Sequence, residues 1–244
     1  MLSESFDFFR QIATQTIDMV FLLTFHDKIP FFAFVLPGLS GCDMMLAYLL
    51  NFILNNCGVS TMRVITGTAR GRRLKELEGM ETRPTLGKVK ESLFSAIQFD
   101  IEGRRVLDLF AGTGQLGIEA LSRGARECIF VDQRRDAVKL IQENLTLCAL
   151  SDRAKVHLGD SMAYLKSGEK FDLIFLDPPY GSGLLAQALT QITTFDICRE
   201  HGIIAAESSD DTVLPAVAPP YRLYREYHYG KVKLTLYHRS GNED

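Results

Sequence analysis

The segment Val106-Leu107-Asp108-Leu109-Phe110-Ala111-Gly112-Thr113-Gly114-Gln115-Leu116-Gly117 predicts the fold of this 244-residue chain. It runs from an apolar strand through a glycine-rich turn into a helix, and glycine in such a turn lets the backbone approach a bound ligand closely. The glycine spacing also fits the dinucleotide-binding pattern G-x-G-x-x-G, so the spacing alone does not identify the ligand. Asp108 at the strand's end distinguishes between the possible ligands, because its carboxylate would repel a pyrophosphate and attract an amino group.

Three further apolar segments are followed by an aspartate, at Asp132, Asp160 and Asp177. In a parallel sheet such strand ends share one edge, where ligands bind. Asp132 is placed to accept the ribose hydroxyls of an adenosine, and Asp160 to meet its adenine amine with Met162 against the ring. A single aspartate after a strand is commonly a helix N-cap, and this alternative stays open for Asp160. Taken together, the four strand ends predict S-adenosylmethionine as the ligand. The expected cofactor-binding residues are Asp108, Phe110, Ala111, Gly112, Gly114, Asp132, Asp160, Ser161 and Met162.

The pentad Leu176-Asp177-Pro178-Pro179-Tyr180 suits the methylation of an amino group on a planar ring. Such an amine is a poor nucleophile because its lone pair is delocalised into the ring. Asp177 can accept one N–H, and the carbonyl of Pro178, held by prolines that fix φ, can accept the other. Tyr180 offers a flat face on which an extruded base could stack, a contact worth roughly 1–3 kcal/mol. A strand followed by an ordinary Pro-Pro turn is the alternative for the pentad alone. We expect the catalytic residues to be Asp177, Pro178, Pro179 and Tyr180.

These segments resemble the Rossmann-like methyltransferases that act on amino groups, and within them the bacterial 16S ribosomal RNA guanine-N2 methyltransferases of the RsmD type. The likeness runs from about Met62 to Arg239. Lys88 and Lys90 stand where this family usually has arginine, and Ser95 where it often has asparagine, which weakens any expectation of bidentate phosphate contact. The matching segments are residues 62–74, Arg83-Pro84-Thr85 with Lys88, Lys90, Glu91, Leu93 and Phe94 after it, residues 107–114, residues 119–125 and residues 176–180.

The resemblance implies an α/β, Rossmann-like methyltransferase fold: a mostly parallel seven-stranded sheet with an antiparallel C-terminal strand and helices on both faces. It also implies methyl transfer from S-adenosylmethionine to the exocyclic N2 of a guanine in 16S ribosomal RNA, within the assembled small subunit, by a monomer. Two alternatives stay open. One is an amino-methyltransferase acting on adenine or cytosine of DNA or on a protein glutamine, and the other is a non-catalytic RNA-binding assembly factor. The pattern of apolar residues predicts helices over residues 115–123, 135–149, 161–166 and 184–192, and later strands over residues 202–207, 223–229 and 232–237.

The chain changes in character near Met62. Residues 1–61 contain two of the 27 basic residues and five of the 30 acidic ones, so residues 62–244 carry 25 of each. The apolar stretches of residues 1–61 are shorter than the roughly 20 residues that span a bilayer. Three interpretations are open: a membrane-associated hairpin, an extra helical region, or upstream sequence translated from a misassigned start codon. We favour the last, because the likeness begins at Met62. The expected division is a leader over 1–61, absent from the native protein or poorly ordered, a basic N-terminal arm and helix over 62–100, and a methyltransferase domain over 101–244.

A run of basic residues without any acid predicts an arm that follows RNA phosphates. Gly67 and Gly71 are expected to make this arm flexible, and a merely solvated loop is the alternative. A helix follows, with Thr85 as the expected N-cap and with Lys88, Lys90 and Glu91 off its buried face. Whether Arg83 and Lys88 face the cofactor or the RNA stays open. The expected RNA-binding residues are Arg63, Arg70, Arg72, Arg73, Lys75, Arg83 and Lys88.

Composition, at 46% hydrophobic and 23% charged residues, fits a cytoplasmic globular enzyme with one sizeable domain. The five cysteines are odd in number and form no C-x-x-C pair, so the sequence predicts neither a disulfide framework nor a zinc site. The five histidines lack metal-ligand spacing. We therefore expect no bound metal and no membrane anchor.

Overall fold

The computed structural model describes residues 62–76 and 84–241, which all belong to one compact unit. The predicted leader, Arg83, Cys42 and Cys57 lie outside the described residues. The first five of the seven strands in the described chain alternate with helices, and the last two follow the fifth directly. In chain order the elements are α3 (Pro84–Ala96), β1 (Arg105–Asp108), α4 (Gln115–Ser122), β2 (Glu127–Asp132), α5 (Arg135–Cys148), β3 (Ala154–Leu158), α6 (Ser161–Tyr164), β4 (Phe171–Leu176), α7 (Leu184–Thr194), β5 (Cys198–Ser209), β6 (Tyr221–Tyr229) and β7 (Val232–Arg239), with short 3-10 turns at Ser151–Arg153 and Leu165–Ser167.

The sheet has the strand order β3-β2-β1-β4-β5-β7-β6. Among β1 to β5 every neighbouring pair is parallel, whereas β7 lies antiparallel between β5 and β6. The predicted fold class is therefore confirmed, including the hairpin that turns at Gly230 and Lys231. The chain order of the strands reverses between β1 and β4, and parallel α/β sheets bind their ligands beyond the carboxyl ends of the strands at such a point.

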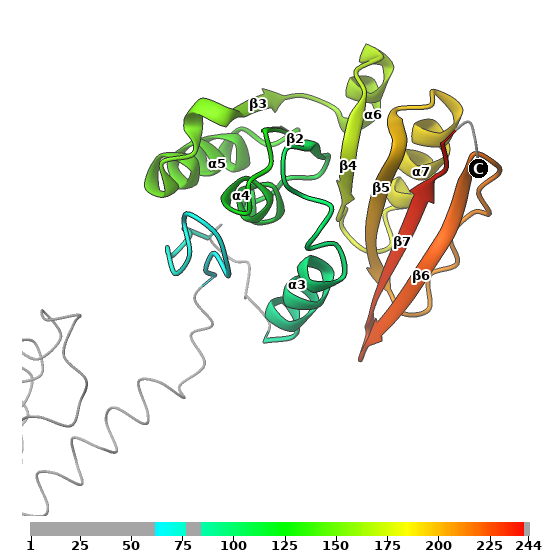
Figure 1. The fold of residues 1–244 in the computed structure, drawn as a ribbon, viewed down its shortest axis with the longest axis horizontal. Helices are drawn as coiled ribbons and strands as arrows, with labels where there is room; N and C mark the ends of the chain where they lie inside the picture. The colour runs from blue at the N-terminus through cyan, green and yellow to red at the C-terminus, as the bar shows by residue number, and fades with distance from the viewer. Residues whose placement is uncertain (1–61, 77–83, 242–244) are drawn as a thin grey trace, which may run out of the picture. The chain divides into compact units, whose positions relative to one another are not determined.

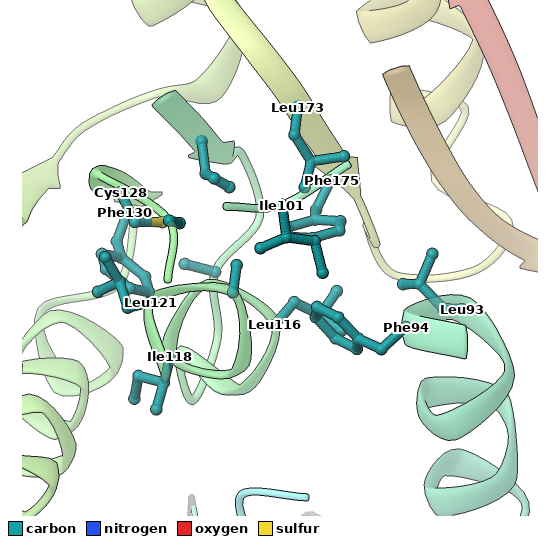
Figure 2. Close-up of a cluster of buried hydrophobic side chains, with 14 of the residues drawn as sticks. Leu93, Phe94, Ile101, Leu116, Ile118, Leu121, Cys128, Phe130, Leu173 and Phe175 are labelled. Atoms are coloured by element: carbon teal, nitrogen blue, oxygen red, sulfur yellow. The ribbon is translucent and has the colours of Figure 1, made fainter. Parts of the chain in front are cut away.

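Helices cover both faces of the sheet (Figure 1). Successive residues of a strand point to opposite faces, so apolar strands give each face its own buried cluster. In β1, Val106 joins one buried cluster with α3, α4 and α5, and Leu107 joins the other with α7. Figure 2 shows the first cluster, in which side chains from α3, α4 and β4 gather between these elements. The rings of Phe94 and Phe175 lie 5.7 Å apart there at a tilted angle. This packing fixes α3 against the sheet.

Residues 62–76 form a closed hairpin on α4, with an isolated antiparallel bridge between Arg63 and Arg73. Ser122 of α4 receives the amide of Thr68 on its backbone oxygen at 2.9 Å and the amide of Ala69 on its hydroxyl at 3.0 Å. A Cβ on Gly67 (φ +84) would stand 1.9 Å from the Ser122 oxygen. The expectation that Gly67 makes this segment flexible is therefore wrong: glycine is required there because the hairpin packs so closely on α4.

Glu119 anchors the same hairpin from inside α4. Its side chain is fully buried, and it accepts the amides of Ile65 at 2.7 Å and Thr66 at 3.0 Å. Arg123 donates its Nε to Glu119 at 2.8 Å, and the Nζ of Lys90 lies 4.0 Å away. The carboxylate of Glu119 therefore links α4 to the backbone of the hairpin.

The structure of α3 differs from the sequence prediction at Lys90 and at Thr85. Lys90 was expected off the buried face, but it is 6% exposed, and its Nζ donates to the Arg63 carbonyl at 2.8 Å. Burial lowers its pKa, and the charge of Glu119 opposes that effect. One side of α3 packs against the sheet, and the hairpin of residues 62–76 covers a second side, where Lys90 lies. The helix also begins at Pro84, so Thr85 lies in its first turn and is not the N-cap; proline is favoured at that first position because its missing N–H costs nothing there.

Candidate active site

A cavity of about 780 Å³ opens at the carboxyl edge of the sheet. All four predicted catalytic residues line it, and so do eight of the nine predicted cofactor-binding residues. The exception is Gly114, which stands before α4 with φ +78, where a Cβ would press within 3.3 Å of Ile118 and Ile141. The further lining residues are Met62, Glu76, Thr113, Gln115, Leu116, Gln133, Arg134, Leu184, Glu207, Gly230, Lys231 and Val232.

Asp108 is a buried carboxyl group at the end of β1, 2% exposed. One of its oxygens accepts the amide of Gly117, 3.0 Å away, in the first turns of α4. Burial raises the pKa of Asp108 to about 7, and the negative charge of Asp132 adds to this rise. A bound ammonium group would favour the ionised form, as the sequence interpretation requires.

Asp132 holds the glycine-rich loop in place. Its Oδ2 accepts the amide of Gly112 at 2.8 Å, and its Oδ1 accepts the amide of Arg134 at 2.8 Å. An ionised carboxylate has about four acceptor positions, so two remain for a ligand in the cavity. The loop is held further by Asn144 of α5, which donates to the Thr113 carbonyl at 3.0 Å.

Asp160 is the N-cap of the short helix α6, since its Oδ1 accepts the amide of Ala163 at 2.7 Å. The alternative that the sequence left open for this residue is thereby confirmed. Asp160 nevertheless lines the cavity together with Ser161 and Met162. The hydroxyl of Ser161 donates to the Leu109 carbonyl at 2.7 Å, which joins α6 to the end of β1.

The Asp-Pro-Pro-Tyr segment leaves the end of β4 beside the cavity. Asp177 is half-buried, and burial together with the charges of Glu207 and Asp108 holds its pKa well above its usual range. Pro178 is buried, whereas Tyr180 is 49% exposed. The Tyr180 hydroxyl donates to Oε1 of Glu207 at 2.9 Å, which fixes the position of the ring.

The sequence interpretation missed Glu207 and the β6–β7 turn as parts of this site. β4 pairs with β5 so that Leu176 is opposite Ala206, which places Glu207 beside Asp177 at the same edge. A signal was present, because Glu207 ends the strand predicted over residues 202–207. The contribution of Gly230, Lys231 and Val232 depends on the antiparallel return of β7, which no local pattern specifies.

The predicted RNA-binding residues that the structure describes lie outside the cavity lining. Arg63, Arg70, Arg72, Arg73 and Lys75 are exposed on the hairpin, and Lys88 is exposed on α3. The Nζ of Lys75 pairs with Glu143 of α5 at 2.7 Å. The two ends of the hairpin, Met62 and Glu76, do line the cavity, and the Met62 amide donates to the Glu76 carboxylate at 2.9 Å. The basic hairpin therefore starts at the rim of the cavity.

Neither a group of three or more His, Cys, Asp and Glu side chains that could hold a metal ion nor a helix suited to crossing a membrane occurs within residues 62–76 and 84–241. Cys128, Cys148 and Cys198 are buried free thiols. The cavity is lined by carboxylates, backbone groups, apolar side chains and other polar side chains, Arg134 and Lys231 among them.

The strand order and this cavity define a methyltransferase with a Rossmann-like fold. Residues 62–238 match the model of the family described as "Conserved hypothetical protein 95", and the chain belongs to that family. The predicted resemblance to the RsmD type is confirmed by its relatives.

Two relatives and one solved structure illustrate the match. The chain is 42% identical over 184 residues to "Putative rRNA methyltransferase YlbH" of Bacillus subtilis, covering 74% of this chain and 100% of that one. It is 32% identical over 186 residues to "Ribosomal RNA small subunit methyltransferase D" of Escherichia coli strain K12, covering 76% and 93%. The solved structure of the Escherichia coli protein named "Putative methyltransferase yhhF" superposes with a TM-score of 0.68 at 30% identity, covering 74% and 98%.

Proposed function

We propose that this protein transfers a methyl group from S-adenosylmethionine to the exocyclic N2 of a guanine in 16S ribosomal RNA, within the assembled small subunit. One observation carries this proposal: the amine-holding segment Asp177 to Tyr180 and the carboxylates Asp108 and Asp132 line the same cavity. The names of the Escherichia coli and Haemophilus influenzae relatives, both small subunit methyltransferases, support the choice of RNA.

The lining of the cavity fits S-adenosylmethionine. Asp108 would hold the ammonium of the methionine part, Asp132 the ribose hydroxyls, and Asp160 with Met162 the adenine ring, and all four residues line the cavity. The loop from Phe110 to Gly112 would pass close beneath the ligand, since Gly112 (φ +54) has no side chain and a Cβ there would meet only the Phe110 oxygen, at 4.0 Å. When bound, the sulfonium supplies a methyl group that needs no metal and no covalent enzyme nucleophile.

The residues of the chain would position the acceptor. The target base would be flipped out of its stem and stacked on Tyr180. Asp177 and the Pro178 carbonyl would each accept one N–H and hold the amine at near-attack distance. The amine proton becomes acidic once the nitrogen carries the methyl group, so Asp177, whose pKa is raised, is a competent acceptor for it.

The hairpin at the cavity rim is proposed to hold the RNA backbone. Its outer side chains Arg70, Arg72 and Arg73 are exposed, while its inner side is bonded to α4. Phosphate contacts of this kind fix register without reading sequence. We propose that residues 62–244 are sufficient for activity and that the protein works as a cytoplasmic monomer.

The experiment is radiolabel transfer from S-adenosylmethionine by the full chain and, in parallel, by a chain beginning at Met62. The acceptors are small ribosomal subunits lacking their own modification, naked 16S RNA and duplex DNA. Label in N2-methylguanine of the subunits is the expected result with both chains. Label only in DNA or protein would replace the proposed acceptor, and cofactor binding without any label would favour an assembly factor.

A further inference from the structure

Glu207 has no assigned part in holding the amine, yet it lies where the acceptor base must enter. It directly follows Ala206, the last residue of β5 that pairs with β4, as Asp177 follows Leu176, and both acidic side chains line the cavity. Its carboxylate is half-buried and already accepts the Tyr180 hydroxyl on Oε1. The second oxygen, Oε2, is thereby held beside the ring on which the base would stack.

The bases differ in what they present next to the exocyclic amine. In guanine, the N2 amine is adjacent to N1–H, so two donors stand side by side. In adenine and cytosine, the amine is adjacent to a ring nitrogen that carries a lone pair. An ionised carboxylate can only accept hydrogen bonds, so two neighbouring carboxylates complement guanine and repel the other two bases.

We propose that Glu207 selects guanine, its carboxylate accepting N1–H while Asp177 accepts an N2–H. This inference rests on the proposed methylation of guanine N2 and names the residue that reads the base. Tyr180 contributes through its hydroxyl, which orients the Glu207 carboxylate and the stacking ring together.

Without a ligand, the two neighbouring carboxyl groups repel one another when both are ionised, which favours a proton on the pair. Burial raises the pKa of Glu207, and the Tyr180 hydrogen bond opposes this by stabilising the ionised form. Burial also raises the pKa of Asp177, and the charge of Glu207 adds to that effect. Two adjacent N–H groups of a bound base would relieve the repulsion between the carboxylates, which a lone pair in the same place would not.

The test replaces the mapped target guanosine of reconstituted small subunits by 2-aminopurine riboside. This base keeps the amine at C2 but has a lone pair at N1 in place of N1–H. For the full-length wild-type protein we expect kcat/KM to be about 10- to 100-fold higher with guanosine, the loss expected for one hydrogen bond to a charged group. Equal rates with the two bases would overturn the proposal without any need for a variant.

The variant Glu207→Gln sharpens the test, because a glutamine amide can donate to the lone pair at N1. We expect it to lose activity on guanosine by about 10-fold or more and to bring the ratio of the two substrates close to one. The matched control Glu200→Gln, an exposed acid on the same strand, should change neither rate. Tyr180→Phe should slow both substrates and lower the preference for guanosine only in part, because Glu207 loses its orienting hydrogen bond but keeps its charge.

If Glu207→Gln slowed both substrates equally, Glu207 would only position Tyr180 and would not distinguish the bases. That result would overturn the inference. Failure of the proposed function is a separate result: the wild type would then leave no N2-methylguanine in guanosine subunits. The guanosine arm with the wild type therefore tests the reaction, and the ratio between the bases tests Glu207.

Discussion

Asp108 in the cavity and Glu119 under the N-terminal hairpin are both buried acids, but the cavity and the hairpin surround their carboxyl groups differently. Glu119 is fully buried and accepts two backbone amides and the Arg123 side chain, with Lys90 nearby. Asp108 and Asp177 lie beside other acids, whose charges add to the effect of burial on their pKa values. The donors of Glu119 belong to the chain itself, whereas those proposed for the cavity come with the ligand.

Burial of a charge therefore does not by itself mark a functional site. A buried charge that is paired within the protein contributes to the structure, and its removal leaves its partners without compensation. A carboxylate that faces a cavity next to like charges has a raised pKa and is available to bind a cation or an N–H donor. Mutations in the two regions should therefore differ in kind: loss of activity in one, loss of stability in the other.

The largest effect is expected for Asp177→Ala in the cavity. Methyl transfer should fall by about 10³-fold or more, because the amine loses the group that orients it, while S-adenosylmethionine binding stays nearly intact. Label transfer and calorimetric titration measure the two quantities. Asp132→Ala should weaken cofactor binding instead. An Asp177→Ala variant with full activity would show that another group holds the amine.

Glu119→Gln is the corresponding change under the hairpin. It removes the charge that compensates Lys90 and Arg123, and it should lower the free energy of unfolding by about 3–5 kcal/mol, the usual effect of breaking a buried ion pair. Urea unfolding followed by circular dichroism measures it. The control Glu143→Gln breaks the exposed pair with Lys75 and should leave the midpoint nearly unchanged. An equal loss of stability in the two variants would contradict a structural role for the buried charge of Glu119.

Gly67→Ala tests the close contact between the hairpin and α4. A Cβ would meet the Ser122 oxygen at 1.9 Å and would also require φ +84, so the expected loss of unfolding free energy is about 3 kcal/mol. Gly71 has a similar φ of +80 but open space around it, and Gly71→Ala should cost only about 1 kcal/mol. Thermal or urea unfolding of the two variants isolates the contact, and equal losses would mean that the hairpin can move away from α4.

Asp108→Asn should change how stability depends on pH. The raised pKa means that the folded protein binds a proton which the unfolded chain releases near pH 3.8, so this contribution is lost as the pH rises to about 7. Between pH 5 and 7 the wild type should lose about 2 kcal/mol through Asp108, and the asparagine variant should not. Urea unfolding at several pH values measures both slopes, and identical slopes would mean that Asp108 is ionised throughout that range.

Local patterns predicted the fold and most of the cavity. The segment from Val106 to Gly117 carries strand, turn and helix in one continuous stretch, and the aspartates sit at strand ends that a parallel sheet must bring to one edge. Such features depend on neighbours within a few residues, so a sequence contains them directly.

What the sequence did not reveal depends on pairs of residues far apart along the chain. Lys90 is buried because its Nζ reaches the Arg63 carbonyl, 27 positions away. Gly67 is constrained by Ser122, and Glu207 joins the site because β4 and β5 pair in one particular register. These contacts follow from tertiary packing, which neither composition nor periodicity specifies.

The smallest effects are expected for substitutions on the outer side of the hairpin, where the exposed arginine side chains are proposed to bind RNA phosphates. Arg70→Gln, Arg72→Gln and Arg73→Gln should each weaken binding to 16S RNA several-fold and reduce the slope of log affinity against log salt by about 1. The folding free energy should hardly change, because these side chains are exposed while the backbone beneath them is held by Glu119 and Ser122. Arg126, exposed just before β2 at the opposite edge of the sheet from the cavity, is the matched control. If Arg126→Gln lowered the salt slope as much as the hairpin variants do, the RNA would be held by the overall charge of the surface, and the hairpin would have a structural role alone.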